Sequence, residues 1–138
     1  MERKVFISKN PSDTWDIGEQ IGKDAKRGDF YALYGELGAG KTQLVKGIAR
    51  GIGVKDWQYV LSPSYTIMNI YEGTLNLCHV DLYRIDGEEV ETFELEDFLE
   101  NGIVVVEWAQ RAVWQNGVTK IEIEATGEEE RKISINRP

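Results

Sequence analysis

The stretch Gly35-Glu36-Leu37-Gly38-Ala39-Gly40-Lys41-Thr42 decides how this chain of 138 residues folds. It matches the phosphate-binding pattern of Gly, four residues, Gly, Lys, and then Ser or Thr. Its glycines let the backbone bend closely around a phosphate, and a helix that begins at Lys41 adds the positive end of its dipole. Lys41 can reach the β- and γ-phosphates of a nucleotide, and the Thr42 hydroxyl can bind Mg²⁺. A plain glycine-rich turn is the alternative, and it leaves the complete pattern unexplained.

The residues on both sides of this loop have the periodicity that the motif requires. Residues 29–34 are an apolar and aromatic run typical of a buried strand. After the loop, apolar residues recur at helical spacing, namely Leu44, Val45, Ile48, Ala49 and Ile52. The sequence therefore predicts one α/β P-loop NTPase domain over residues 1–138, with a largely parallel central sheet flanked by helices and with antiparallel hairpin strands.

Other segments supply the remaining elements of this fold. Residues 5–7 and 103–106 are expected to be strands, the second one central because it is wholly apolar. A helix is expected from the capping residue Asn10 to Lys26, with close packing indicated by two glycines in its buried stripe. Two antiparallel hairpins are predicted, one from residues 67–71 and 75–82 and one from residues 118–125 and 131–135.

The charge distribution restricts the kinds of partner that the chain can bind. The formal net charge is −8, from 24 acidic and 16 basic residues, and residues 86–100 contain eight acids without a Lys or Arg. The remaining 16 acids balance the 16 bases, which argues against unaided binding to nucleic acid. The acidic stretch is expected to be helical. It is either a solvated helix face or a docking face for a basic partner.

The composition also restricts where in the cell the protein is expected and which metals it can bind. A single cysteine and a single histidine allow neither an internal disulfide nor a zinc cluster. No apolar run approaches the roughly 20 residues of a membrane span. We therefore expect a soluble cytoplasmic protein without membrane contact, whose metal arrives with a nucleotide.

Two acids stand where parallel strands present their ligand groups. Asp81 ends the second strand of the first hairpin, and Glu107 follows the apolar run 103–106. Glu107 is expected to assist Mg²⁺, because a buried acid without a partner carries a heavy desolvation cost. Asp81 either polarises the attacking water or is a turn acid, and His79 is either a hydrogen-bonded core residue or a base. The hydroxyl-rich residues 62–66 are either a switch loop or a turn.

Taken together, four motifs make the chain similar to the bacterial TsaE (YjeE) family over essentially its whole length. They are the phosphate loop at 35–42, Ser-Pro-Ser-Tyr-Thr at 62–66, His-Val-Asp-Leu-Tyr-Arg at 79–84 and Val-Glu-Trp at 106–108. The resemblance implies an ATPase of tRNA threonylcarbamoyladenosine formation. Departures from the family pattern are Gln43 and Ser64, where Thr is frequent, and Ala109, where Pro is frequent.

The resemblance also implies roles for residues and partners. Lys41 and the amides of the loop bind the ATP phosphates, and Thr42 and Glu107 hold Mg²⁺. Asp81 and Trp108 are needed for hydrolysis, and residues 62–66 form the switch. The expected partners are TsaB and the Kae1-like TsaD, through which tRNA is reached only indirectly. Gln43 is expected to place an amide near the α-phosphate.

Two rival functions share the phosphate loop. A small-molecule or nucleotide kinase needs an acceptor site and an Arg-bearing lid, and no insertion in the sequence is long enough for a lid. In an ATP-gated docking module, hydrolysis is incidental and the acidic stretch binds the partner. For the isolated chain we expect slow turnover, because no obvious residue positions the attacking water.

Overall fold

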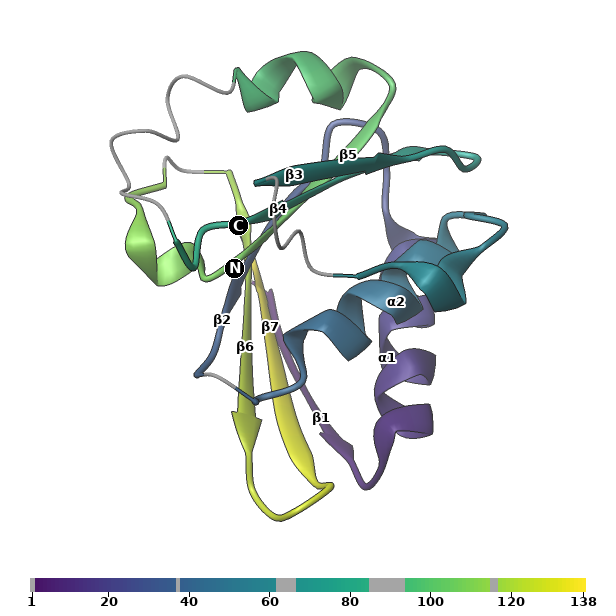
Figure 1. Cartoon of the computed structure of the whole chain (residues 1–138). Coiled ribbons are helices and arrows are strands. Elements are labelled where there is room, and N and C mark those ends of the chain that lie inside the picture. Colours follow the sequence, from purple (N-terminus) through teal and green to yellow (C-terminus); the bar gives the residue numbers. More distant parts are fainter. Residues whose placement is uncertain (1, 37, 62–66, 85–93, 115–116) are drawn as a thin grey trace.

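A computed structural model describes residues 2–36, 38–61, 67–84, 94–114 and 117–138. In these ranges seven strands form one sheet, ordered β1-β7-β6-β2-β5-β4-β3, with two α-helices beside it (Figure 1). The strands are β1 Glu2–Ser8, β2 Phe30–Tyr34, β3 Met68–Tyr71, β4 Asn76–Asp81, β5 Gly102–Glu107, β6 Thr119–Ala125 and β7 Arg131–Arg137. The helices are α1 Pro11–Asp24 and α2 Lys41–Gly51, with 3-10 helices η1 Trp57–Tyr59, η3 Leu95–Glu100 and η4 Ala109–Arg111.

The centre of the sheet is parallel and its flanks are antiparallel. Strand β2 pairs in parallel with β5 and β6, and β4 pairs in parallel with β5. The pairs β3–β4, β6–β7 and β1–β7 are antiparallel. The predicted parallel centre is therefore confirmed, but the sheet as a whole is mixed rather than largely parallel. Both predicted hairpins are present, and strands joined by a short turn must pair antiparallel.

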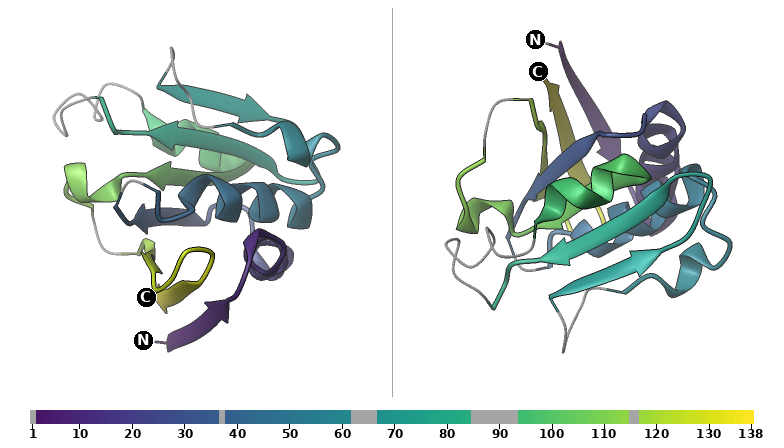
Figure 2. Two further views of the ribbon diagram at one scale, coloured as in Figure 1. Left: turned by 60° about the horizontal axis from the view of Figure 1, so that its bottom comes forward. Right: turned by 90° about the horizontal axis from the view of Figure 1, so that it is seen from above.

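Strand β5 lies in the middle of two hydrophobic layers, as its apolar sequence predicts. Every residue of β5 is buried. One layer, between the sheet and the helices α1 and α2, includes Leu44, Ile48 and Val105. The opposite layer packs Val104 and Val106 against η3 and the segment that follows β5. Both described α-helices thus cover one face of the sheet (Figure 2), and the 3-10 helix η3 packs against the other.

Helix α1 begins where its sequence predicts and ends two residues earlier. The Asn10 side chain accepts a hydrogen bond of 2.9 Å from the Asp13 N–H, and Pro11 occupies the first helical position. The helix ends at Asp24 rather than at Lys26. The reason is a turn in which the Lys26 N–H donates to the Asp29 carboxylate at 2.8 Å, with Gly28 in the left-handed region.

Glycines bring α1 and α2 into direct backbone contact, as the glycines of α1 indicate. A Cβ atom built on Gly18 would lie 2.5 Å from the Leu44 carbonyl oxygen and 2.8 Å from the Gly47 Cα. Gly22 of α1 similarly faces Gly51 of α2. The two helices therefore approach as closely as their backbones allow along the middle and the end of α2.

Gly18→Ala is expected to lower the free energy of unfolding by about 2 kcal/mol. Alanine favours a helix by about 1 kcal/mol over glycine, but overpacking costs about 1–3 kcal/mol. Here the added methyl meets backbone atoms that cannot rotate away, so its cost lies at the upper end or beyond. Urea unfolding measures the change. Gly127→Ala is the matched control, because its added Cβ lies no closer than 3.5 Å to the Glu130 side chain. Equal stability of the two variants would contradict this account of the helix contact.

The remaining predicted segments are described only in part. The predicted acidic helix contains η3, which ends before Asn101-Gly102 as expected, while residues 85–93 lie outside the described ranges. Leu37 and residues 62–66 also lie outside them. Between α2 and residue 62 the chain forms the short helix η1. No helix in the described ranges is long and apolar enough to cross a membrane.

Candidate nucleotide-binding site

The glycine-rich loop joins the end of β2 to the start of α2, which is the context that its sequence requires. Gly38 and Gly40 have φ values of 79° and 96°, in the left-handed region that favours glycine. Gly40 is the N-cap of α2, and no described side chain caps this helix start. The first amides of α2 therefore form the kind of position where anions bind at helix N-termini.

Lys41 lies buried at the mouth of this loop, with 5% of its surface exposed. Its ammonium group donates to the carbonyl oxygens of Gly35 at 2.7 Å and Glu36 at 2.9 Å. The same group lies 4.1 Å from the centre of the Trp108 ring, a cation–π contact. Burial lowers the pKa of Lys41, and the charges of Glu107, Asp81 and Glu36 oppose this shift.

Side chains from distant segments hold the outer side of the loop. The Arg131 guanidinium of β7 donates to the carbonyl oxygens of Ala39 at 2.8 Å and Gly38 at 3.3 Å. The Gln110 amide of η4 donates to the Gly35 carbonyl at 3.1 Å. Because a trans peptide points its N–H away from its C=O, the Gly40 N–H faces away from Arg131. The sequence alone gives no sign that Arg131 and Gln110 contact the loop, because no local pattern links these residues to it.

Thr42 and Glu107 converge from helix and sheet. The Thr42 hydroxyl lies 3.3 and 3.4 Å from the two carboxylate oxygens of Glu107. Glu107 ends β5 with 2% of its surface exposed, so its carboxylate is buried beside the first turn of α2. A hydroxyl and a carboxylate at this distance are oxygen ligands that one Mg²⁺ ion can share with nucleotide phosphates.

His79 is a buried hydrogen-bonding residue, one of its two predicted roles. It is fully buried in β4, and its Nε2 atom lies 2.5 Å from Oε2 of Glu107. His79 pairs with Val105 in the register of β4 and β5, so Glu107 is its diagonal neighbour on the same face. This position places the imidazole behind the carboxylate and away from solvent.

Asp81 stands directly beside Glu107, because these two residues are partners in the β4–β5 register. Its carboxylate accepts a hydrogen bond of 2.8 Å from the Tyr83 N–H, the turn contact expected of an acid at a strand end. Burial raises the pKa of Asp81, an effect that the Tyr83 N–H opposes. Both predicted roles fit this position, since the turn contact engages one oxygen of an acid that also faces the site.

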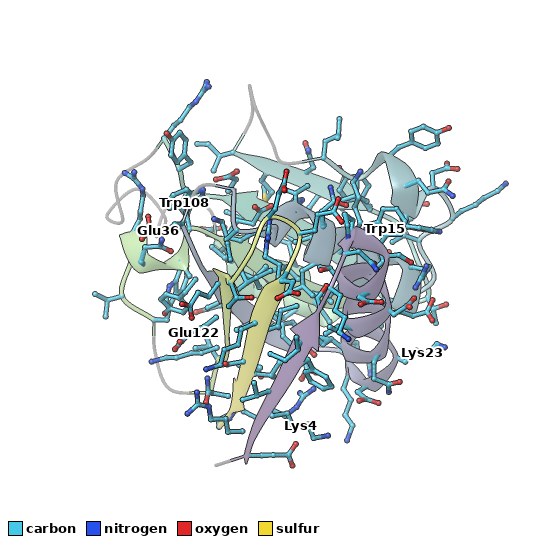
Figure 3. All side chains as sticks on the ribbon, turned by 90° about the horizontal axis from the view of Figure 1, so that it is seen from below. Lys4, Trp15, Lys23, Glu36, Trp108 and Glu122 are labelled. Carbon is cyan, nitrogen blue, oxygen red and sulfur yellow. The ribbon has the colours of Figure 1, made fainter. Side chains whose placement is uncertain are left out.

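Trp108 follows β5 in a strained conformation that turns its ring onto Lys41. Its φ of 58° is in the left-handed region, where non-glycine residues are uncommon. The ring also packs on Tyr83, with a centroid distance of 4.9 Å. Figure 3 shows Trp108 beside Glu36, and the Lys41 ammonium contacts the Trp108 ring and the Glu36 carbonyl.

The amide of Gln43 is tied to α1 rather than left free. Its Oε1 atom accepts a hydrogen bond of 2.6 Å from the indole N–H of Trp15. This contact orients the amide within the first turn of α2. The expectation that Gln43 faces the α-phosphate stays a prediction, now with Trp15 as the residue that holds it.

A separate hollow of about 460 Å³ lies behind the loop, against β6 and β7. Its lining includes Arg3, Lys132, Glu36, Glu122 and Glu124. Three carboxylates against two cations make it a poor receptor for the phosphates of a nucleotide. This lining is less suited to an anion than the uncapped start of α2 is.

The oxygen donors of Thr42 and Glu107 fit a magnesium ion that is shared with a nucleotide. The described residues contain no group of three or more His, Cys, Asp or Glu side chains that could hold a metal ion. Mg²⁺ is usually bound through one or two protein oxygens together with substrate phosphates and water. The pair Thr42 and Glu107, next to an uncapped helix start, matches that requirement.

Fold and site together define a mixed α/β domain in which a phosphate-loop sequence joins a parallel strand to a helix. The family model described as threonylcarbamoyl adenosine biosynthesis protein TsaE matches residues 8–133. The chain belongs to the TsaE family.

Individual members of this family are similar over nearly the whole chain. The tRNA threonylcarbamoyladenosine biosynthesis protein TsaE of Aquifex aeolicus is 37% identical over 135 residues, covering 97% of this chain and 96% of that protein. The protein of the same name from Bacillus subtilis is 38% identical, covering 98% of this chain and 86% of its own length. The crystal structure of Bacillus subtilis YdiB has a TM-score of 0.75 at 30% identity, covering 99% of this chain and 86% of that one.

Proposed function

We propose that this chain is a Mg²⁺-dependent ATPase that supports a TsaB–TsaD complex in forming N6-threonylcarbamoyladenosine in tRNA. The observation that carries the proposal is the convergence of the Thr42 hydroxyl and the Glu107 carboxylate beside the glycine-rich loop. Membership of the TsaE family supports the place in tRNA threonylcarbamoyladenosine biosynthesis. The reaction is attack of water on the γ-phosphorus of ATP, which releases ADP and phosphate.

The loop binds and orients the phosphates in this proposal. Gly38 and Gly40 expose the backbone amides, and the α2 dipole favours the negative charge of the phosphates. Lys41 leaves the carbonyls of Gly35 and Glu36 and moves to the γ-phosphate. Because Lys41 is already buried before ATP binds, little water must be removed from its ammonium group when it contacts the phosphate.

Thr42 and Glu107 would hold a magnesium ion, which would supply positive charge that neutralises the nucleotide phosphates. Asp81 lies next to Glu107 and is placed to orient a water molecule at the site. Trp108 covers Lys41 and keeps its ammonium group from bulk water. Three of these residues, Asp81, Glu107 and Trp108, lie at the carboxyl ends of the adjacent parallel strands β4 and β5, where open α/β sheets bind ligands.

Family membership and charge support the choice of partners in this proposal. The chain carries a net charge of −8, which disfavours direct contact with tRNA. A protein complex that itself binds tRNA therefore agrees with this composition better than a direct RNA interaction. TsaB and TsaD supply this contact in the proposal, and ATP turnover resets or activates their complex.

The test is ATP hydrolysis by the purified chain with Mg²⁺, first alone and then with TsaB and TsaD. Slow turnover alone and stimulation by the partners are expected. If ATP binds but the partners change neither turnover nor association, the role in tRNA modification is wrong for this chain. A screen of phosphoryl acceptors would then test the kinase alternative.

A further inference from the structure

His79 is a buried histidine of β4 that contacts the carboxylate of Glu107. Its imidazole is fully buried between the helix layer and the sheet, and its Nε2 atom contacts Oε2 of Glu107 at 2.5 Å. Its Nδ1 atom is buried and has no hydrogen-bond partner among the described residues. Burying a polar atom without a partner costs about 1–3 kcal/mol. A buried aliphatic side chain would avoid this cost, so stability alone does not account for histidine here.

The contact restrains the Glu107 carboxylate from behind. A glutamate has three side-chain torsions, and a carboxylate that binds a metal must be held in one orientation. On its front side Glu107 meets the Thr42 hydroxyl at 3.3 and 3.4 Å, which is a long contact that restrains it weakly. On its rear side the His79 ring is itself immobilised by the packed strands β4 and β5. Of the two contacts described for Glu107, the one with His79 is therefore the more rigid.

We propose that His79 is a positioning residue that donates its Nε2–H to Oε2 of Glu107 and holds this carboxylate in the orientation that binds Mg²⁺. A carboxylate only accepts hydrogen bonds, so the contact assigns the imidazole proton to Nε2. The inference rests on the proposed function, because it concerns the same Mg²⁺–nucleotide site. Outer partners of this kind typically change metal affinity by about 10- to 100-fold when they are removed.

The first test compares His79→Leu with His79→Gln. Leucine fills the space without a donor, whereas the glutamine amide retains an N–H donor. Binding of ADP is measured by calorimetry in EDTA and at increasing MgCl₂ concentrations. For His79→Leu we expect about 10- to 100-fold more Mg²⁺ to reach half of the magnesium effect, with ADP affinity in EDTA unchanged. His79→Gln is expected to stay close to the wild type.

Leu77→Val is the matched control, because Leu77 lies two residues earlier on the same face of β4 and is also fully buried. It loosens the packing of this strand without touching Glu107. The proposal is overturned if His79→Leu keeps the wild-type magnesium requirement. It is also overturned if Leu77→Val raises that requirement as much as His79→Leu does.

A second measurement reads the contact without nucleotide or activity. His79 is the only histidine of the chain, so ¹⁵N-histidine labelling gives one assigned imidazole in the NMR spectrum. We expect the proton on Nε2, and Glu107→Gln should shift the Nε2 resonance more than the Nδ1 resonance. A proton on Nδ1 would overturn the proposal. Wild-type ADP binding without any magnesium effect would instead reject the proposed function, whatever the state of the imidazole.

Discussion

Replacing Lys41 with alanine is expected to lower partner-stimulated ATP hydrolysis by about 10²- to 10³-fold, the usual cost of removing one preorganised donor from a reacting site. The ammonium group lies at the mouth of the loop, 2.7 Å from the Gly35 carbonyl and 4.1 Å from the Trp108 ring. No other change in the loop removes a full positive charge from that place. Release of phosphate, measured at saturating ATP, tests the effect on turnover.

The stability of this variant supplies an independent check. Burial lowers the pKa of Lys41, so the folded state disfavours the charged lysine relative to the unfolded state at neutral pH. Removal of this charge is therefore not expected to lower the thermal midpoint. Lys46→Ala, in the same helix, is the matched control and should retain turnover. If Lys41→Ala retained wild-type hydrolysis, the loop would not be the site of ATP binding.

Replacing Glu107 with alanine is expected to lower hydrolysis in the assembled complex by at least about 100-fold, since even partners outside the metal's ligands contribute about 10- to 100-fold. Glu107 is 2% exposed, and its carboxylate faces the Thr42 hydroxyl. Binding to the partner proteins is expected to persist, because the side chain lies inside the domain. Turnover and co-elution with TsaB and TsaD are the two measurements.

Glu100→Ala is the matched control for this experiment. Glu100 ends η3 just before the opposite end of β5, and its side chain is exposed. Its removal is expected to leave turnover unchanged. Full hydrolysis by Glu107→Ala in the complex would contradict the catalytic assignment. Loss of both hydrolysis and partner binding would favour the docking module, in which the nucleotide site controls association.

Several elements could be predicted because their signals are local. The start of α1 can be predicted from Asn10, Pro11 and Asp13, which lie within four consecutive residues. The apolar run 103–106 predicts a buried central strand. The sequence predicts the end of α1 two residues too late, because the turn that ends it depends on a hydrogen bond from the Lys26 N–H to the Asp29 carboxylate, three residues further along the chain. The sequence also predicts only part of the antiparallel pairing, because it does not indicate where β1 joins the sheet. Strand β1 joins β7, its partner at the far end of the chain.

The candidate site is only partly visible in the sequence. The loop 35–42, Asp81 and Glu107 can be found from their motif and from their positions at strand ends. The residues that contact them cannot be found in this way. Arg131 donates a hydrogen bond to the loop from 92 residues away in the chain. The diagonal contact of His79 with Glu107 depends on the register of β4 and β5. A shift of that register by one residue would turn His79 to the other face of the sheet.

By itself the sequence determined the phosphate loop, the helix that follows it and the apolar strand that carries Glu107, because backbone bending, capping and hydrophobic periodicity act over a few residues. Only the tertiary structure decided that Thr42 meets Glu107 across 65 residues and that His79 lies behind this carboxylate. Those contacts follow from strand order, strand register and the glycine contact between α1 and α2. Each of these features is set by packing among segments that are distant in the chain, and no local pattern encodes it.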